Sequence, residues 1–79
     1  MPTIFEIFGM RFFFYMNDHE PIHVHVEYQG CLAKIRVYPE VELVYNHGIK
    51  AGALKKALDT AVTYQSEIIN EWYKNFPKL

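Results

Sequence analysis

The hydrophobic pattern of this chain changes period near residue 50, and that change limits the fold more than any other feature. Up to about residue 45, short apolar runs alternate with turn residues, which is typical of β-strands. From Lys50 onward, apolar residues recur at helical spacing. They are Leu54, Leu58, Ala61, Val62, Ile68, Ile69, Trp72 and Phe76. We therefore expect an α+β fold: an antiparallel β-meander of four to five strands over about residues 3–45, then one long C-terminal α-helix over about residues 50–75, packed on one sheet face.

Turn residues divide the first half of the chain into short segments. Gly9 supplies the positive φ of a tight turn, residues 17–21 form a longer turn, and Gln29-Gly30 form a two-residue loop. Pro39-Glu40 interrupts the chain once more. The expected strands cover residues 3–8, 10–16, 22–28, 31–38 and 41–45.

Size and composition exclude several classes of protein. The 79 residues allow a single domain, residues 1–79. The lone Cys31 excludes an internal disulfide and a cysteine-based zinc cluster. A net charge of −1 argues against a generic polycationic nucleic-acid binder. No targeting signal is evident, and no apolar stretch approaches the roughly 20 residues that span a membrane, so we expect a cytoplasmic protein without a membrane partner.

The expected helix is longer than the expected strands. About 25 helical residues extend roughly 38 Å, whereas a strand of six or seven residues spans roughly 22 Å. The helix must therefore bend or overhang the sheet, and an overhanging end would expose Trp72, Tyr73 and Phe76. The second face of a lone sheet would also lack a cover. Both features predict a homodimer.

The hairpin around Gln29-Gly30 sorts its side chains onto two faces. A two-residue loop sets a register in which His25 lies across from Lys34. In the same register His23 lies across from Arg36. We call this side of the sheet the histidine face; in this hairpin it consists of His23, His25, Glu27, Leu32, Lys34 and Arg36. The opposite, apolar face packs on the helix and consists of Ile22, Val24, Val26, Tyr28, Cys31, Ala33, Ile35 and Val37.

The preceding strand extends both faces if the sheet is continuous. Arg11, Phe13 and Tyr15 then join the histidine face, while Phe12, Phe14 and Met16 lie on the other side. The histidine face would thus mix aromatic and basic groups.

Three kinds of chemistry fit the clustered histidines, and the first is metal binding. His-x-His is a common ligand spacing, and His19 or Glu27 would add a third donor. Lys34 and Arg36 argue against it, because fixed positive charges repel a divalent cation. We therefore expect no metal or other cofactor; a metal, if bound, would use His19, His23 and His25.

The second is anion binding, which uses those same charges. Two imidazoles beside an ammonium and a guanidinium can hold a phosphate, and neighbouring aromatic rings would stack on the bases of RNA. Two histidines next to a phosphodiester would also serve as general base and general acid. In such a hydrolase His23 and His25 are catalytic, and Lys34 and Arg36 stabilise developing charge.

The third is a purely structural role. Asn17, Asp18 and His19 would then build the turn before Pro21. The paired histidines on the strand would line a dimer interface through ordinary cross-strand contacts.

Several short motifs match a known family. They are Met-Pro-Thr-Ile at the start, Tyr-x-Asn-Asp-His-x-Pro-x-His-x-His at residues 15–25, Glu-Tyr-x-Gly at residues 27–30, and Glu71-Trp72. With them the chain resembles, over nearly its whole length, a small bacterial family known as domain of unknown function 4160. Ile22 stands where the family often has a second proline, and Val24 where an aromatic residue often separates the histidines. Both differences are conservative for a strand.

The resemblance implies a protein partner. Members of the family are often encoded beside another small protein, and the pair is suspected of being a toxin–antitoxin module. The site residues that the resemblance implies are Asp18, His19, His23 and His25, with Pro21 as a rigid turn residue.

Our leading hypothesis from the sequence is a small cytoplasmic interaction protein, one half of a toxin–antitoxin-type pair, whose histidine face contacts RNA or a partner protein. The binding residues would be Asp18, His19, Lys34, Arg36, Arg11 and Tyr15. The first alternative is a metal-independent ribonuclease that uses His23 and His25. The second is a divalent-metal-binding module.

Overall fold

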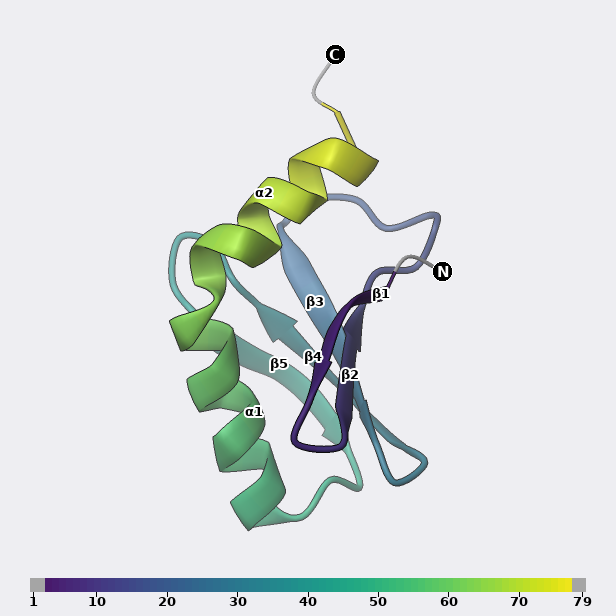
Figure 1. The fold of residues 1–79 in the computed structure, drawn as a ribbon, viewed down its shortest axis with the longest axis vertical. Helices are drawn as coiled ribbons and strands as arrows, with labels where there is room; N and C mark the ends of the chain where they lie inside the picture. Colours follow the sequence, from purple (N-terminus) through teal and green to yellow (C-terminus); the bar gives the residue numbers. More distant parts are fainter. Residues whose placement is uncertain (1–2, 78–79) are drawn as a thin grey trace.

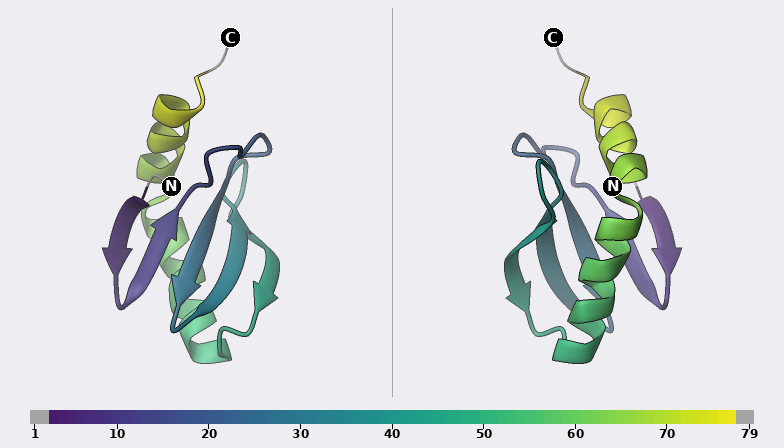
Figure 2. Two further views of the ribbon diagram at one scale, coloured as in Figure 1. Left: turned by 90° about the vertical axis from the view of Figure 1, so that its right-hand side faces the viewer. Right: turned by 90° about the vertical axis from the view of Figure 1, so that its left-hand side faces the viewer.

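A computed structural model describes residues 3–77 and has the expected α+β architecture. One antiparallel sheet contains β1 (Thr3–Ile7), β2 (Met10–Phe13), β3 (His23–Tyr28), β4 (Cys31–Arg36) and β5 (Glu42–His47), in that spatial order. Two helices follow, α1 (Ala51–Thr63) and α2 (Gln65–Asn75), and both lie on one side of the sheet (Figures 1 and 2). The predicted meander is therefore confirmed. Met1 and Pro2 of the Met-Pro-Thr-Ile motif, and residues 78–79 of the expected domain, lie outside the described residues.

The prediction of one long helix is wrong, because the helical segment is broken at Tyr64. This residue has φ −106° and ψ 22°, outside the helical range, and it ends α1 and precedes α2. Just before the break, the hydroxyl of Thr60 donates to the Lys56 carbonyl at 2.7 Å and that of Thr63 to the Asp59 carbonyl at 3.0 Å. Such back-bonding threonines commonly bend helices.

Residues at the break contact the loop after β4 and the strand β1. The Gln65 side chain donates from Nε2 to the Val37 carbonyl oxygen at 2.7 Å and to that of Pro39 at 3.3 Å. The Tyr64 ring packs on Phe5 with ring centroids 5.1 Å apart. The bend keeps Trp72 in the core, where it is only 1% exposed. The exposure of Trp72 that an overhanging straight helix would cause is therefore not observed.

The core lies between the helices and the apolar face of the sheet. The strand residues at its centre are fully buried; they include Phe12, Val24, Val26, Ala33 and Ile35. Val24, Val26, Ala33 and Ile35 belong to this core and the histidines of the same hairpin do not, as the predicted partition into two faces requires. Within the described residues, no helix has the length and apolar character needed to cross a membrane.

The predicted register of the central hairpin is confirmed. His23 pairs with Arg36 and His25 with Lys34 across β3 and β4. The turn between the strands uses positive φ at Gln29, 49°, and at Gly30, 78°, as a two-residue hairpin loop requires.

The strand before it is shorter than expected. β2 ends at Phe13, and residues 14–22 leave the sheet before β3 begins. Phe13 pairs with His25, so it lies on the histidine face as predicted. It is nevertheless only 1% exposed, which shows that this end of the second sheet face is covered.

Candidate functional site

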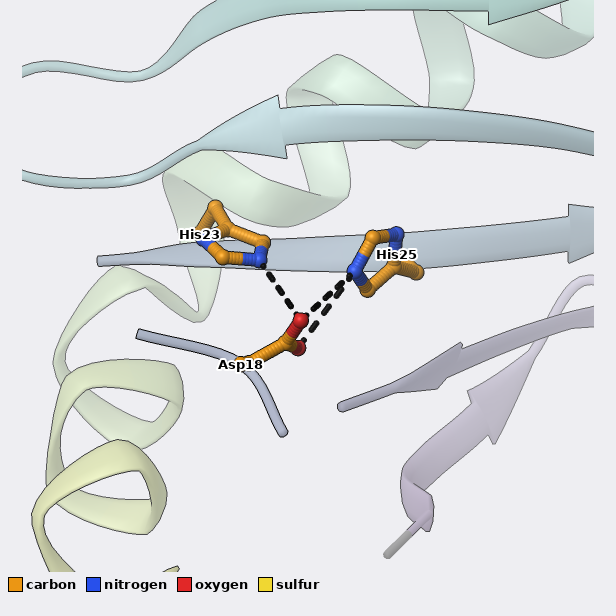
Figure 3. Close-up of side chains that lie close together, drawn as sticks. All are labelled: Asp18, His23 and His25. Carbon is orange, nitrogen blue, oxygen red and sulfur yellow. Dashed lines mark hydrogen bonds and ion pairs between the residues drawn. The ribbon is translucent and has the colours of Figure 1, made fainter. Parts of the chain in front are cut away.

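Three side chains meet over the start of β3: Asp18, His23 and His25 (Figure 3). Oδ1 of Asp18 lies 3.2 Å from Nε2 of His23, and Oδ2 lies 3.4 Å from Nε2 of His25. One donor atom from each residue lies within 4.8 Å of the other two. All three side chains are largely buried; the Asp18 side chain is 10% exposed and the histidines are 3% and 4% exposed.

Local structure explains why these residues meet. His23 and His25 alternate along β3 and so project from the same face. Asp18 sits in the turn after Tyr15: its N–H donates to the Tyr15 carbonyl oxygen at 3.1 Å, and its Oδ2 accepts the Tyr15 N–H at 2.9 Å. This reciprocal turn aims the carboxylate at the two imidazoles.

The tautomer of neutral His23 follows from its hydrogen bonds. Nδ1 lies 2.7 Å from the Pro21 carbonyl oxygen, which can only accept, so Nδ1 carries the proton. Nε2 then presents a lone pair toward Asp18. Although Oδ1 is 3.2 Å away, Nε2 has no hydrogen-bond partner among residues 3–77. A buried nitrogen lone pair therefore faces a carboxylate, an arrangement that costs free energy unless a cation joins it.

The surroundings of His25 favour the neutral imidazole. Burial lowers its pKa below the ordinary 6.5, although the charge and hydrogen bond of Asp18 act in the opposite direction; His23 and Lys34 lower it further. Nε2 makes a long hydrogen bond of 3.4 Å to Oδ1 of Asp18. Nδ1 is buried and has no partner within the described part of the chain.

Aromatic rings enclose the two imidazoles. The Tyr15 ring lies edge-on to His25 with centroids 4.5 Å apart, and Phe13 lies 5.5 Å from the same ring. Trp72 of α2 lies 5.2 Å from His23. The donor atoms thus sit in a largely apolar shell, which strengthens any charge interaction made there.

Tyr45 of β5 belongs to the same surroundings, although sequence reasoning did not select it. Burial raises its pKa above the ordinary 10.0, and the nearby Tyr15 and Asp18 contribute to the rise. It stands across from Lys34 in the sheet register. The sequence predicted a strand at residues 41–45 but gave no register for it, so nothing there assigned Tyr45 to this site.

The basic residues of the histidine face are mostly paired. Arg11 donates to Oε1 of Glu27 from Nε at 3.1 Å and from Nη2 at 2.9 Å, and it covers the Phe13 ring at 4.1 Å. Arg36 forms an ion pair of 3.2 Å with Glu42. Both guanidinium charges are thereby offset, whereas Lys34, across from His25, forms no ion pair among the described residues. The repulsion expected against a metal ion is therefore weakened at Arg36 but not at Lys34.

Some of the remaining predicted site residues contact the cluster of Asp18, His23 and His25, and others do not. Tyr15 contacts the cluster through His25 and through its backbone bonds to Asp18. His19 is exposed and is not part of the cluster of donor atoms, nor is Glu27. Asp18 therefore supplies the third donor. The sequence predicted Asp18 as a binding residue and, in the structural alternative, as a turn residue. Its approach to the histidines depends on the path of residues 14–22.

The donor set suits a transition-metal ion. Two imidazoles and one carboxylate bind zinc, iron(II) and related divalent ions. Ligand atoms about 2.1 Å from a tetrahedral zinc ion lie roughly 3.4 Å apart. The separations between Asp18 and the two histidines, 3.2 and 3.4 Å, are close to that value. His23 also has the backbone acceptor on its other nitrogen that typically orients a metal-binding histidine.

Comparison with known proteins identifies the family. The chain belongs to the family described as domain of unknown function DUF4160, whose model matches residues 9–73. This range covers most of the chain and includes all three cluster residues. No curated protein and no solved structure matches the chain significantly.

Proposed function

We propose that this protein binds one divalent transition-metal ion between Asp18, His23 and His25, and that the ion fixes residues 14–22 against the sheet of a small interaction protein. One observation carries the proposal. The buried Nε2 of His23 faces the Asp18 carboxylate at 3.2 Å without a hydrogen bond. A metal ion would use both atoms as ligands.

A proton explains this geometry less well than a metal ion. A protonated Nε2 would donate along the axis of its N–H bond, and that direction does not meet an acceptor among residues 3–77. A metal ion lies on the lone-pair axis of the nitrogen and away from the straight line between two ligand atoms. The contact between His23 and Asp18 has this geometry. Nε2 of His25 makes a long hydrogen bond of 3.4 Å to Asp18, so a metal ion would displace the proton of that nitrogen.

Burial favours a structural or sensing role for the ion over a catalytic one. The Asp18 side chain is 10% exposed and the histidines less, which limits the approach of a substrate. The same segment carries Met16, which is 76% exposed, and the exposed His19. An ion held by Asp18 would order this segment and present those two side chains to a partner.

Titration with zinc and with manganese tests metal binding. We expect zinc to bind with one-to-one stoichiometry in calorimetry and to raise the melting temperature by about 10 °C at a hundredfold excess over Kd. Because Trp72 is the only tryptophan and lies 5.2 Å from His23, its fluorescence should change with the same stoichiometry.

Histidines outside the cluster provide matched controls. His23→Ala and His25→Ala should abolish the response to zinc, whereas His19→Ala and His47→Ala, both at exposed positions, should leave it intact. Absence of a heat of binding at tens of micromolar zinc would contradict the proposal. So would zinc binding that survives in the double variant of His23 and His25.

The remaining hypotheses stay predictions from the sequence. These are RNA contact, phosphodiester cleavage, homodimer formation and a toxin–antitoxin-type pair. The burial of His23 and His25 and the pairing of Arg36 with Glu42 give less support to phosphate chemistry at this face than the sequence suggested.

A further inference from the structure

A second candidate site lies away from the histidines, along the edge strand β1. A cleft of about 400 Å³ opens between this strand and α2. Its apolar lining comes from Ile4, Phe5, Ile7 and Tyr64. The metal proposal uses none of these residues.

The cleft continues along the strand. A neighbouring cleft of about 290 Å³ shares Ile7 and Tyr64 with the first and extends beside α1 to Phe8 and Lys56. The two together follow β1 from its start to the turn that ends it. A groove of this shape fits an elongated ligand better than a compact one.

The backbone of β1 is available for pairing. In the sheet order β1 is an outer strand whose one partner among the described residues is β2 (Figure 2). An edge strand presents a row of unpaired N–H and C=O groups, and extended peptides bind such edges by adding a strand. The adjoining groove would receive every second side chain of the added strand.

The charge around the groove selects the kind of peptide. Glu6, Glu67 and Glu71 line the first cleft, and its lining includes no basic residue. The second cleft adds one acidic and one basic residue, Asp59 and Lys56, so the groove as a whole keeps an excess of acidic groups. Lys74 offsets part of this charge, since its Nζ lies 3.3 Å from Oε1 of Glu71. Glu6 pairs with Arg11 in the sheet register, so its side chain lies on the side of the sheet away from the helices. On that side an added strand would lie next to Glu6.

We infer that β1 and the groove beside it bind an extended basic segment of another protein, in which apolar residues alternate with Lys or Arg. A second copy of this chain fits less well, because a symmetric contact would bring the same three glutamates of each copy to one interface.

A synthetic probe tests the inference: a capped heptapeptide that alternates lysine and valine, added to the intact protein at low ionic strength. We expect chemical-shift changes at the backbone amides of β1 and α2, and at least tenfold slower hydrogen exchange at the outer amides of β1. A peptide with glutamate in place of lysine should not bind.

Charge-removing variants complete the test. Glu67→Gln combined with Glu71→Gln should raise the Kd of the lysine peptide about fivefold, because each exposed pairing is weak. Glu40→Gln, at an exposed position outside the groove, should leave it unchanged. Equal binding of the two peptides, an unchanged Kd in the double variant, or shifts that avoid β1 would each overturn the inference. A homodimer joined through β1 would overturn it as well, because a second copy of this chain would then occupy the groove.

Discussion

Nε2 of His23 and Oδ1 of Asp18 lie 3.2 Å apart, yet no hydrogen bond joins them. The Pro21 carbonyl fixes the proton of neutral His23 on Nδ1, so that two electron-rich atoms face each other in a buried site. Such a contact is unfavourable by itself. It becomes favourable when a cation lies between the two atoms, and this links the geometry of the turn to the proposed metal site.

Replacing the carboxylate by an amide separates metal binding from folding. In Asp18→Asn the amide oxygen can still accept the Tyr15 N–H. The NH₂ group in place of Oδ1 removes the negative charge beside Nε2 of His23, but it also removes the acceptor of Nε2 of His25. These two effects oppose each other, so we expect the unfolding free energy of the metal-free variant to stay within about 1 kcal/mol of the wild type. Its zinc affinity should fall at least a hundredfold, because an anionic ligand is lost. Urea unfolding with and without zinc measures both quantities.

The matched control for this variant is Asp59→Asn. Asp59 is exposed and pairs with Lys55, so its replacement should leave the zinc response unchanged. A metal-free Asp18→Asn protein that is strongly destabilised, together with an undiminished response to zinc, would show that Asp18 serves the turn alone.

The stability of the metal-free protein should depend on pH through His25. Burial lowers the pKa of this residue in the folded state below its ordinary 6.5, so the unfolded state binds more protons between the two values. The contribution is complete above pH 6.5 and is lost as the pH falls toward the folded pKa. The loss is at most about 1.4 kcal/mol per pH unit for one group.

Urea unfolding between pH 8 and pH 5 measures this dependence. His25→Gln should flatten the profile, whereas His19→Gln at an exposed position should not. A stability that rises toward acid would contradict the prediction, because it would mean that pairing of an imidazolium with Asp18 outweighs burial.

The sequence predicted the parts of this fold that depend on alternation and loop length. Alternation along β3 placed His23 and His25 on one face. The two-residue loop at Gln29-Gly30 determined the register of β3 and β4, which placed Arg36 and Lys34 across from them. Alternation assigns a side chain to a face, but it does not say what covers that face. For this reason the burial of both histidines could not be predicted.

Two further features depend on contacts between distant segments. Asp18 reaches the histidines through the path of residues 14–22, which has no periodic pattern. The helix breaks at Tyr64 where Gln65 bonds to the loop after β4, a contact across 28 and 26 positions in sequence. The apolar spacing continues through the break, so periodicity alone predicted a single helix.

Gln65 should be important for stability although it is a polar residue near the surface. Gln65→Ala removes the 2.7 Å hydrogen bond to the Val37 carbonyl and the 3.3 Å bond to that of Pro39. We expect a loss of about 1–2 kcal/mol in unfolding free energy, because a partly buried acceptor is left without its donor. The exposed neighbour provides the control, since Ser66→Ala should change stability by less than about 0.5 kcal/mol. Equal effects of the two substitutions in urea unfolding would indicate that this contact does not hold the break.

Two glycines should respond to alanine in opposite directions. Gly48 has φ +100°, and a Cβ there would lie 3.1 Å from Sγ of Cys31. Gly48→Ala should therefore destabilise the protein by about 1–3 kcal/mol through backbone strain and crowding.

Gly52 lies in the first turn of α1, and a Cβ there would meet nothing within 4 Å. Gly52→Ala should be neutral or stabilising by up to about 1 kcal/mol, because alanine restricts the unfolded chain and favours the helix. Thermal and urea unfolding of both variants test this difference in sign. If Gly48→Ala is as stable as Gly52→Ala, the turn from β5 into α1 does not require the positive φ of Gly48.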